Sequence, residues 1–456
     1  ILYKYLISKL LNISLKKEII IVTILLSIII IIQCLVFYYF KSYPGWDWND
    51  VFNSARLFAS GHADEIDNSY FQMFPNNNAL LYFEIIIFKV LSIFKIQLSV
   101  TNCLYATIIV NILLIDISIV LMYFTVRIMF DKSKAILSLI IAMICCAFTI
   151  YVPVFYTDTV TMMFPIFILL CYSIWQKKIN QKNIDLIFIL MAFISVFGIK
   201  LKFTVIIMII AILIDMVLKY DFKRYFKPVS IISISMIVFY LSFGLIEKNL
   251  NVFSFDISNN NKKMPYTHWI MMGLKGLGKY DEHDDYYTRS FHSKQEKQDA
   301  NVKVIKERVK KYKIGGLYDH MVKKAVWTWQ DGTYYISYHN QKPKNDNILM
   351  DFLHINGKYN KAFQNYSSAL QMFILLMICI SALKTLVRPK VDEMLLLKGI
   401  VFSAFLFFLL WETRSRYLFN MTPLFILLMV DGMDTAKTFL DSLKKPGKRT
   451  AEQTTV

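Results

Sequence analysis

The chain has 456 residues, of which 56% are hydrophobic and 18% charged, and its mean hydropathy is +0.45. Soluble domains carry about a quarter charged residues, so this composition argues against a soluble protein. The formal net charge of +18 does not predict nucleic-acid binding. Lys and Arg lie mainly in short segments between apolar blocks, not in a basic stripe interleaved with stacking aromatics. The sequence therefore predicts an all-α polytopic membrane protein.

Ten nearly uncharged blocks approach, with their flanking residues, the roughly 20 residues that cross a bilayer. They are Ile19–Phe40, Thr107–Val126, Ala135–Tyr151, Val160–Trp175, Ile184–Gly198, Phe203–Val217, Val229–Ile246, Met372–Leu383, Met394–Trp411 and Leu418–Val430. We expect about ten transmembrane helices, interfacial juxtamembrane helices and one large extracytoplasmic loop.

Basic linkers set the predicted orientation, since Lys and Arg favour the cytoplasmic side. Leu80–Phe94 is predicted to lie in the membrane interface, because every later basic linker then falls inside. The protein is expected in the plasma membrane with both termini cytoplasmic. Its predicted parts are an N-terminal transmembrane module (1–247) with the candidate catalytic outer loop (41–100), an extracytoplasmic loop subdomain (248–366), C-terminal transmembrane helices (367–436) and a basic cytoplasmic tail (437–456).

Two acidic residues, Asp47 and Asp50, follow the first block in an aromatic stretch. Three residues apart, they would share one face of a helix start. A carboxylate at such a membrane boundary is partly desolvated, which raises its basicity toward that of a general base. The same residues also fit an acidic helix N-terminus beside interfacial tryptophans.

A second acid and two lysines are predicted on the same outer face. Asp158 follows an exit from the membrane, where it could also cap the next helix. Lys200 and Lys202 lie at a tight outer turn, against the orientation bias. A nearby phosphate would offset their cost, whereas snorkelling to lipid headgroups is the alternative.

A further group on the predicted outer face lies toward the C-terminus and consists of Glu412, Arg414, Arg416 and Tyr417. Arginine forks suit phosphate and carboxylate recognition. A structural knot of ion pairs between outer loops is the competing interpretation. These residues predict an anion-binding site at the membrane boundary.

The long loop contains two aromatic stretches, 264–273 with His268 and Trp269, and 326–335. Such aromatics stack on sugars and also anchor loops to membranes. No residue pattern predicts a metal site, because the cysteines lie in or beside apolar blocks and the candidates His62, Asp64 and Glu65 are too loosely grouped. Dependence on Mg²⁺ or Mn²⁺ is left open.

The order of these features resembles the GT-C class of membrane glycosyltransferases, which includes protein O-mannosyltransferase and aminoarabinose transferase types. The resemblance covers the chain to about Tyr220 and again 394–431, and no single motif is diagnostic. The stretches Pro-Tyr-Thr-His-Trp and Trp-Gln-Asp-Gly-Thr-Tyr also look like those of membrane glycosyltransferases from low-GC Gram-positive bacteria. The chain departs from the aminoarabinose type in having Trp48, not an acid, after Asp47.

The resemblance implies inverting transfer of a sugar from a polyprenyl-phosphate donor to a cell-envelope glycan, lipid or protein at the outer face. Asp47, or else Asp50, would be the base, and Asp158 would support the base or the acceptor. Lys200, Lys202, Arg414 and Arg416 would hold the donor phosphate. Membrane lipids are the surroundings, and no nucleic acid is implied.

Two alternatives remain open from the sequence. A polysaccharide polymerase or ligase should depend on the outer Arg and His residues and tolerate loss of Asp47. A lipid-linked sugar flippase or transporter needs polar residues through the membrane midplane. The spans look apolar there apart from Asn111, Asp116 and Asp215, so transport ranks last.

Overall fold

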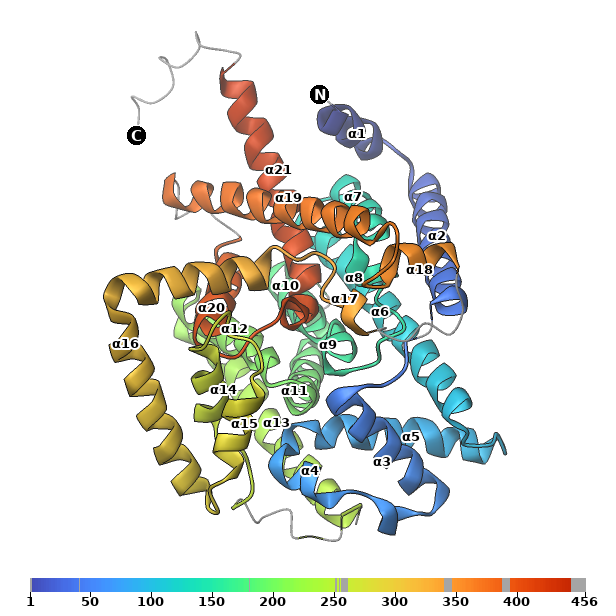
Figure 1. Ribbon diagram of the computed structural model, residues 1–456. Helices are drawn as coiled ribbons and strands as arrows, with labels where there is room; N and C mark the ends of the chain where they lie inside the picture. The colour runs from blue at the N-terminus through green and yellow to red at the C-terminus, as the bar shows by residue number, and fades with distance from the viewer. Residues whose placement is uncertain are drawn as a thin grey trace.

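The computed structural model describes residues 2–40, 42–179, 181–250, 252–253, 255, 261–339, 347–387 and 394–443. Within these residues every regular element is a helix, and none is a strand (Figure 1). The α-helices are α1 (Leu2–Leu11), α2 (Leu15–Tyr39), α3 (Trp46–Ser60), α4 (Asn68–Met73), α5 (Asn78–Ile93), α6 (Val100–Met129), α7 (Lys132–Ile144), α8 (Cys146–Thr149), α9 (Thr157–Val160), α10 (Met163–Gln176), α11 (Ile184–Leu201), α12 (Ile206–Lys219), α13 (Phe222–Asn249), α14 (Tyr266–Gly273), α15 (Glu282–Arg289), α16 (Lys294–Trp329), α17 (Ile336–His339), α18 (Ile348–Leu353), α19 (Asn360–Val387), α20 (Leu395–Leu410) and α21 (Thr422–Leu443).

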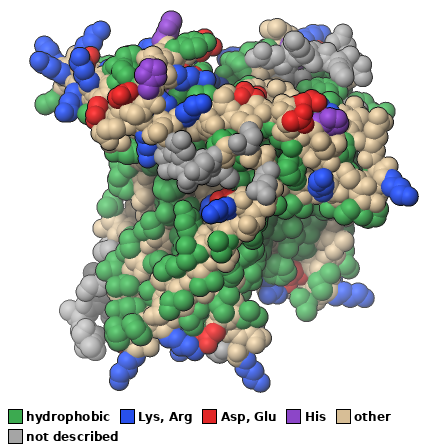
Figure 2. Space-filling view, turned by 90° about the horizontal axis from the view of Figure 1, so that it is seen from below, with side chains coloured by type: hydrophobic (Ala, Val, Ile, Leu, Met, Phe, Trp, Pro, Cys, Tyr) green, Lys and Arg blue, Asp and Glu red, His purple; other side chains and the backbone are tan. Residues whose placement is uncertain are grey.

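Six segments within the described residues are long and apolar enough to cross a membrane. They are α2, α6, the segment Thr157–Gln176 that contains α9 and α10, α11, α13 and α19. Figure 2 shows a band of hydrophobic side chains between two edges that carry charged ones. The protein is therefore an integral membrane protein, as its composition predicts.

The other four predicted blocks also form helices, but shorter or interrupted ones. The block Ala135–Tyr151 divides at Cys145 into α7 and α8, and α12 and α20 have 14 and 16 residues. Helix α21 has 22 residues, but its second half carries several charges. Hydropathy reports composition and not backbone breaks, so the count of ten spans stays a prediction.

Two polar side chains in the spans, Asn111 and Gln33, donate hydrogen bonds within the helix bundle. Asn111 Nδ2 donates to the carbonyls of Val152 and Val154, at 2.8 and 3.0 Å. These carbonyls lie in the non-helical segment between α8 and α9, which could not otherwise satisfy them away from water. Gln33 Nε2 similarly donates to Asp116 Oδ1 at 2.9 Å. Asn111 and Asp116 thus have structural partners within the helix bundle.

The ends of the helices form two separate polar layers. In one layer α1, α7 and α21 meet, since Tyr3 donates to Asp434 at 2.5 Å and Lys134 pairs with the same carboxylate at 2.6 Å. Most of the predicted basic tail, residues 444–456, lies outside the described residues. The opposite layer contains α3, the start of α9, the end of α11 and the chain after α20, which together carry the candidate site.

Between α13 and α19 the chain forms helices that pack over this second layer. The long helix α16 bends at Lys313, whose φ is 53°, and its two legs are visible in Figure 1. Gly332 follows α16 in a turn against α19, where a Cβ atom would lie 2.0 Å from the Ser367 carbonyl oxygen. Only glycine permits this close approach, which fixes the position of the following residues.

Candidate active site

Arg416 lies at the centre of a buried polar cluster. Its guanidinium carbon is 4.5 Å from the ring centroid of Trp46, 5.4 Å from that of Tyr156 and 5.5 Å from that of Tyr417. Burial lowers the pKa of Arg416, but Asp158 and the surrounding tyrosines outweigh it and raise the pKa above its ordinary value. Aromatic faces stabilise a cation in such a position.

Asp158 joins Arg416 to a second cation. The Asp158 carboxylate pairs with Lys202 Nζ, and its other oxygen lies 3.6 Å from Arg416 Nε. All three side chains are largely buried, because Asp158 begins α9 and Lys202 directly follows α11. Two cations thus share the one Asp158 carboxylate, so N–H donors of both remain for a further anion.

Asp47, in the first turn of α3, is the next carboxyl of the cluster. Burial raises its pKa, whereas Arg416 and a hydrogen bond from Tyr70 favour its ionised form. The side chain remains partly accessible to solvent. Asp50 lies one turn further along α3 and is more exposed than Asp47; partial desolvation of its carboxyl raises its pKa, and the charges of Asp47 and Asp67 raise it further. Of the two acids, Asp47 is the one under the influence of Arg416.

Asn77 holds the two tyrosines that flank Asp47 and Arg416. Its Nδ2 donates to the Tyr70 hydroxyl oxygen at 2.5 Å, and its Oδ1 accepts from the Tyr156 hydroxyl at 3.4 Å. Because the Tyr70 oxygen accepts from Asn77, its own proton is free to point at Asp47. Asn77 is buried, so this segment is more than the simple turn that its Pro/Asn composition indicates.

His339, at the end of α17, packs against the Trp46 ring, which Arg416 also contacts. The two rings lie 4.7 Å apart, and the His339 Nε2 atom is 2.8 Å from the Tyr151 hydroxyl. Burial and the charges of Arg416 and Arg414 lower the pKa of His339, so its ring is neutral. Three buried polar atoms of this region have no hydrogen-bond partner: His339 Nδ1, Arg416 Nε and Glu412 Oε1. Buried polar atoms are normally paired, so the cluster has the character of a ligand site.

A strained turn supports the same region. Trp46, Tyr334 and Tyr335 have φ values of 45°, 52° and 68°, which non-glycine residues rarely adopt. Asp331 holds the turn, because one carboxylate oxygen accepts from the Thr333 amide at 2.9 Å and the other from the Tyr335 amide at 3.1 Å. The latter oxygen also accepts from the Ser415 hydroxyl at 2.7 Å. Asp331 thereby ties the turn after α16 to the residue between the two arginines.

Two further candidate residues after α20, Glu412 and Arg414, lie close to Arg416 or to its aromatic neighbours. Glu412 is buried, and one of its carboxylate oxygens accepts from the Tyr417 hydroxyl at 2.7 Å. Burial raises the pKa of Glu412. The Arg414 guanidinium carbon lies 5.0 Å from the ring centroid of Tyr335. Trp269 stacks on Trp411 with centroids 5.4 Å apart, and its carbonyl accepts from the Glu412 amide at 2.9 Å.

Not every candidate residue joins the cluster. Lys200 pairs with Glu247 of α13 at 3.0 Å and lies 4.8 Å from the centroid of Tyr240. A lysine on a helix points away from a neighbour two positions on, so Lys200 and Lys202 serve different partners. Trp48 is fully buried in the hydrophobic core. The position after Asp47 therefore faces the core and not the Arg416 cluster.

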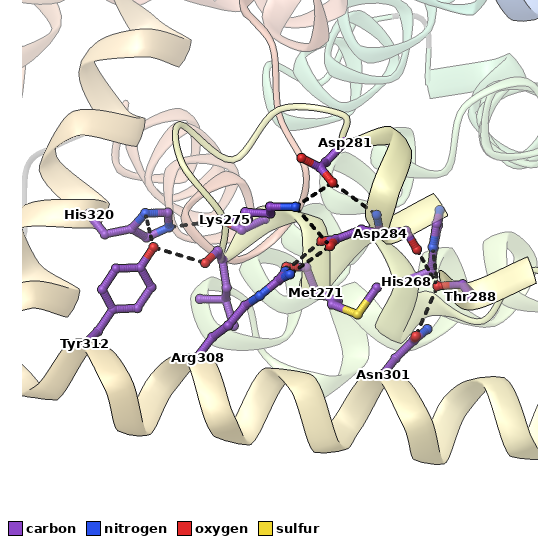
Figure 3. Close-up of polar contacts among 12 residues, drawn as sticks. His268, Met271, Lys275, Asp281, Asp284, Thr288, Asn301, Arg308, Tyr312 and His320 are labelled. Carbon is purple, nitrogen blue, oxygen red and sulfur yellow. Dashed lines mark hydrogen bonds and ion pairs between the residues drawn. The ribbon is translucent and has the colours of Figure 1, made fainter. Parts of the chain in front are cut away.

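His268 belongs to a separate polar network between α14, α15 and α16, shown in Figure 3. Its Nδ1 lies 2.9 Å from the Thr288 hydroxyl, which donates to Asn301 at 3.0 Å. In the same network Arg308 forms two bonds with the Asp284 carboxylate, at 2.6 and 2.7 Å (Figure 3). We refer to the ten side chains labelled in Figure 3 as the α14–α16 network.

Several contributors to the cluster were not singled out as site residues from the sequence, among them Asn77, Asp331 and His339. Asn77 and Asp331 lie in stretches that stand out by composition, and only their long-range partners distinguish them from ordinary turn residues. His339 is a lone histidine with no motif around it. Its contacts with Trp46 and Tyr151 join residues nearly 300 and 200 positions apart, which no local pattern indicates.

The family model described as "Conserved hypothetical integral membrane protein" matches residues 1–437. The chain belongs to this family. No curated protein matches its sequence.

The fold is similar to that of solved oligosaccharyltransferases. For archaeal AglB from Archaeoglobus fulgidus, in complex with an inhibitory peptide and a dolichol-phosphate, the TM-score is 0.50 at 13% identity, over 96% of this chain and 53% of that chain. For the apo form of the Archaeoglobus fulgidus oligosaccharyltransferase it is 0.50 at 14% identity, over 95% and 52%. The chain thus spans about half the length of these proteins. The likeness shows a fold shared with these oligosaccharyltransferases.

Proposed function

We propose that the protein is an inverting glycosyltransferase that moves a sugar from a polyprenyl-phosphate donor to a hydroxyl of a cell-envelope acceptor. The observation that carries the proposal is the largely buried group of Asp158, Lys202 and Arg416 beside Asp47 at one end of the helix bundle, where Arg416 Nε has no hydrogen-bond partner. The GT-C-like fold supports it, and so does the dolichol-phosphate bound by archaeal AglB.

In the proposed reaction Asp47 is the general base. Its carboxylate takes the proton of the acceptor hydroxyl while the oxygen attacks the anomeric carbon of the sugar. A base is most effective when its pKa lies near the working pH, and burial shifts the pKa of Asp47 in that direction. Tyr70 and Asn77 orient the carboxylate through their hydrogen bonds.

The bond between the sugar and the phosphate breaks as the new bond forms, so the phosphate leaves with the electron pair. Arg416 and Lys202 would stabilise this growing negative charge. Asp158 fixes both cations in place before the donor arrives. Arg414 and the neutral ring of His339 would contribute further contacts, whereas Lys200 is left outside the proposed site because Glu247 neutralises it.

No step of the proposal runs through a metal ion. Within the described part of the chain, no group of three or more His, Cys, Asp or Glu side chains comes close enough together to hold one. We further propose that the site faces the outside of the plasma membrane, with both termini in the cytoplasm. The outward orientation rests on the basic linkers between spans.

The test is a transfer assay with the purified full-length protein in detergent, a panel of polyprenyl-phosphate sugars and crude envelope acceptor. Asp47→Asn should lower transfer by roughly 10² or more, because the base is lost while the shape is kept. Asp50→Asn is the matched control on the same helix and should transfer normally. Unchanged transfer by Asp47→Asn would exclude it as the base and favour a polymerase or ligase that works through the arginines.

A further inference from the structure

A group of basic side chains lies near the end of α4, where the Met264 amide donates to the Met73 carbonyl and Arg289 lies against Phe74. It comprises Arg289 at the end of α15, Lys262 and Lys263 before α14, and Lys294 and Lys297 in the first turns of α16; we call it the basic surface. Lys297 Nζ donates to the Lys262 carbonyl at 2.8 Å. Burial lowers the pKa of Lys297, and the nearby charges of Arg289 and Lys262 lower it further.

The pKa of a second lysine of this group, Lys263, is lowered for the same two reasons. Burial and the charge of Lys294 lower the pKa of Lys263. Like charges at such separations destabilise one another, and proteins usually place a carboxylate between them. Four of these cations, Lys262, Lys263, Arg289 and Lys294, reach solvent, and Lys297 lies buried beside them.

Carboxylates in the described residues do not neutralise this surface. None of its four lysines forms an ion pair with an acidic side chain there, and Arg289 alone has one, with Asp285 at 2.7 Å. The nearest acid in sequence, Glu296, accepts instead from the amides of His292 and Ser293. The amides at the start of α16 are thus capped, so side chains, not the helix terminus, supply the positive charge.

The basic surface is continuous with the surroundings of Asp47. The Met264 amide donates to the Met73 carbonyl at 3.0 Å, and the Arg289 guanidinium lies 5.5 Å from the Phe74 ring centroid. Phe74 in turn packs on Tyr70, the residue that bonds to Asp47. The basic surface is thus next to the residues around Asp47, and the charge of Arg289 acts on the Asp47 carboxyl.

Exposed tyrosines accompany the cations. Tyr266 begins α14, Tyr286 lies on α15, and Tyr280 is close to Asp285 and Arg289. Tyrosine rings stack on sugar faces and their hydroxyls bond to sugar oxygens. Lysine binds phosphate groups as a point charge. Sugars and anionic groups along one chain would fit this combination, whereas a lipid headgroup would use only the charges.

We propose that the basic surface binds the acceptor, and that the acceptor is an anionic polymer of phosphate-linked sugars or polyols. This inference rests on the proposed function, since it names the substrate that presents its hydroxyl to Asp47. It makes the basic surface the determinant of acceptor choice and leaves donor binding to the cluster around Arg416.

Binding can be measured without transfer. Fluorescent poly(glycerol phosphate) and dextran of matched length serve as anionic and neutral probes for the full-length protein in neutral detergent, read by fluorescence anisotropy. The test variant is Lys262→Gln/Lys263→Gln/Lys294→Gln, which spares the buried Lys297. The control is Lys303→Gln/Lys306→Gln/Lys310→Gln, which removes the same charge from exposed positions of the same helix.

The wild type and the control should bind poly(glycerol phosphate) and not dextran. The test variant should bind it roughly tenfold more weakly at low salt, and the difference should shrink at high salt. Equal binding by all three proteins would overturn the inference. So would wild-type binding to phosphatidylglycerol vesicles, lost in the test variant, without polymer binding. Normal polymer binding without sugar transfer to any acceptor would instead count against the proposed function.

Discussion

Two polar regions of the molecule differ in how completely their groups are paired. In the α14–α16 network, Asp284 accepts two bonds from Arg308, and Thr288 bonds to both His268 and Asn301. Around Arg416, buried atoms of three residues, Arg416, Glu412 and His339, have no hydrogen-bond partner, whereas beside the network one described atom, Asp285 Oδ1 at 3.6 Å from His268 Nε2, lacks one. The first region holds three helices together. The second is arranged for a group that comes from outside the chain.

The same difference appears in the backbone. The α14–α16 network joins regular helices, apart from the bend at Lys313 in α16. The Arg416 cluster is built from helix ends and a turn, with Trp46, Tyr334 and Tyr335 at positive φ. Such strain persists only where the surrounding structure enforces it, and it is concentrated at functional sites. Pairing and strain together distinguish a binding site from a structural network of similar composition.

The largest loss of transfer activity is expected from Arg416→Gln, in the less completely paired of the two regions. The substitution removes the positive charge proposed to stabilise the leaving phosphate, so transfer should fall by roughly 10² or more. Single-turnover rates with saturating donor measure the chemical step. Arg416→Lys should recover only part of the activity, because an ammonium lacks the planar fork. A wild-type rate in Arg416→Gln would show that the cluster is structural.

An intermediate effect is expected from Asn77→Ala. Without the Asn77 amide, the Tyr70 proton is no longer directed at Asp47, so the ionised carboxylate loses a hydrogen bond. The pKa of Asp47 should rise and the transfer rate should fall roughly tenfold at neutral pH. The acidic limb of the pH–rate profile should move to higher pH, since Asp47 must be deprotonated to act.

The control for that variant is Asn53→Ala, which removes an amide on α3 that bonds only to Asn49 among the described residues. It should leave the pH–rate profile in place. A uniform loss of rate in Asn77→Ala, with no shift of the acidic limb, would mean that Asn77 supports the fold and does not position the base.

The smallest effect on catalysis is expected from Arg308→Gln. It breaks the ion pair with Asp284, so the free energy of unfolding should fall by roughly 2 kcal/mol, since the pair is partly buried. Thermal unfolding in detergent measures this loss. Transfer per folded molecule should stay at the wild-type level. A selective loss of transfer without loss of stability would remove the distinction between the two regions.

The sequence predicts the membrane fold well but the site only in part. Apolar blocks locate the helices, because burial in lipid requires such runs whatever the tertiary contacts. Hydropathy does not reveal the non-helical segment between α8 and α9, whose Val152 and Val154 carbonyls accept from Asn111 some 40 residues away. Asp47, Asp158, Lys202 and Arg416 stand out as charges at membrane boundaries, and the structure brings these four together.

What the sequence does not predict is which of the outer charges share partners. Lys200 and Lys202 look equivalent in sequence, yet Glu247 of α13 engages one and Asp158 the other. Asn77 and His339 act through tyrosines that are distant in sequence. Pairings of this kind follow from helix packing, which a single sequence does not specify.

The most direct test of the central claim is the binding of sugar-free polyprenyl phosphate, the proposed leaving group, followed through tryptophan fluorescence because Trp46 lies against Arg416. Wild type and Arg308→Gln should bind it with the same affinity, although Arg308→Gln unfolds more easily. Arg416→Gln should bind it at least roughly tenfold more weakly, because a buried charged contact is lost. Equal affinity in Arg416→Gln and wild type, or no binding by either, would contradict a lipid-phosphate site at Arg416.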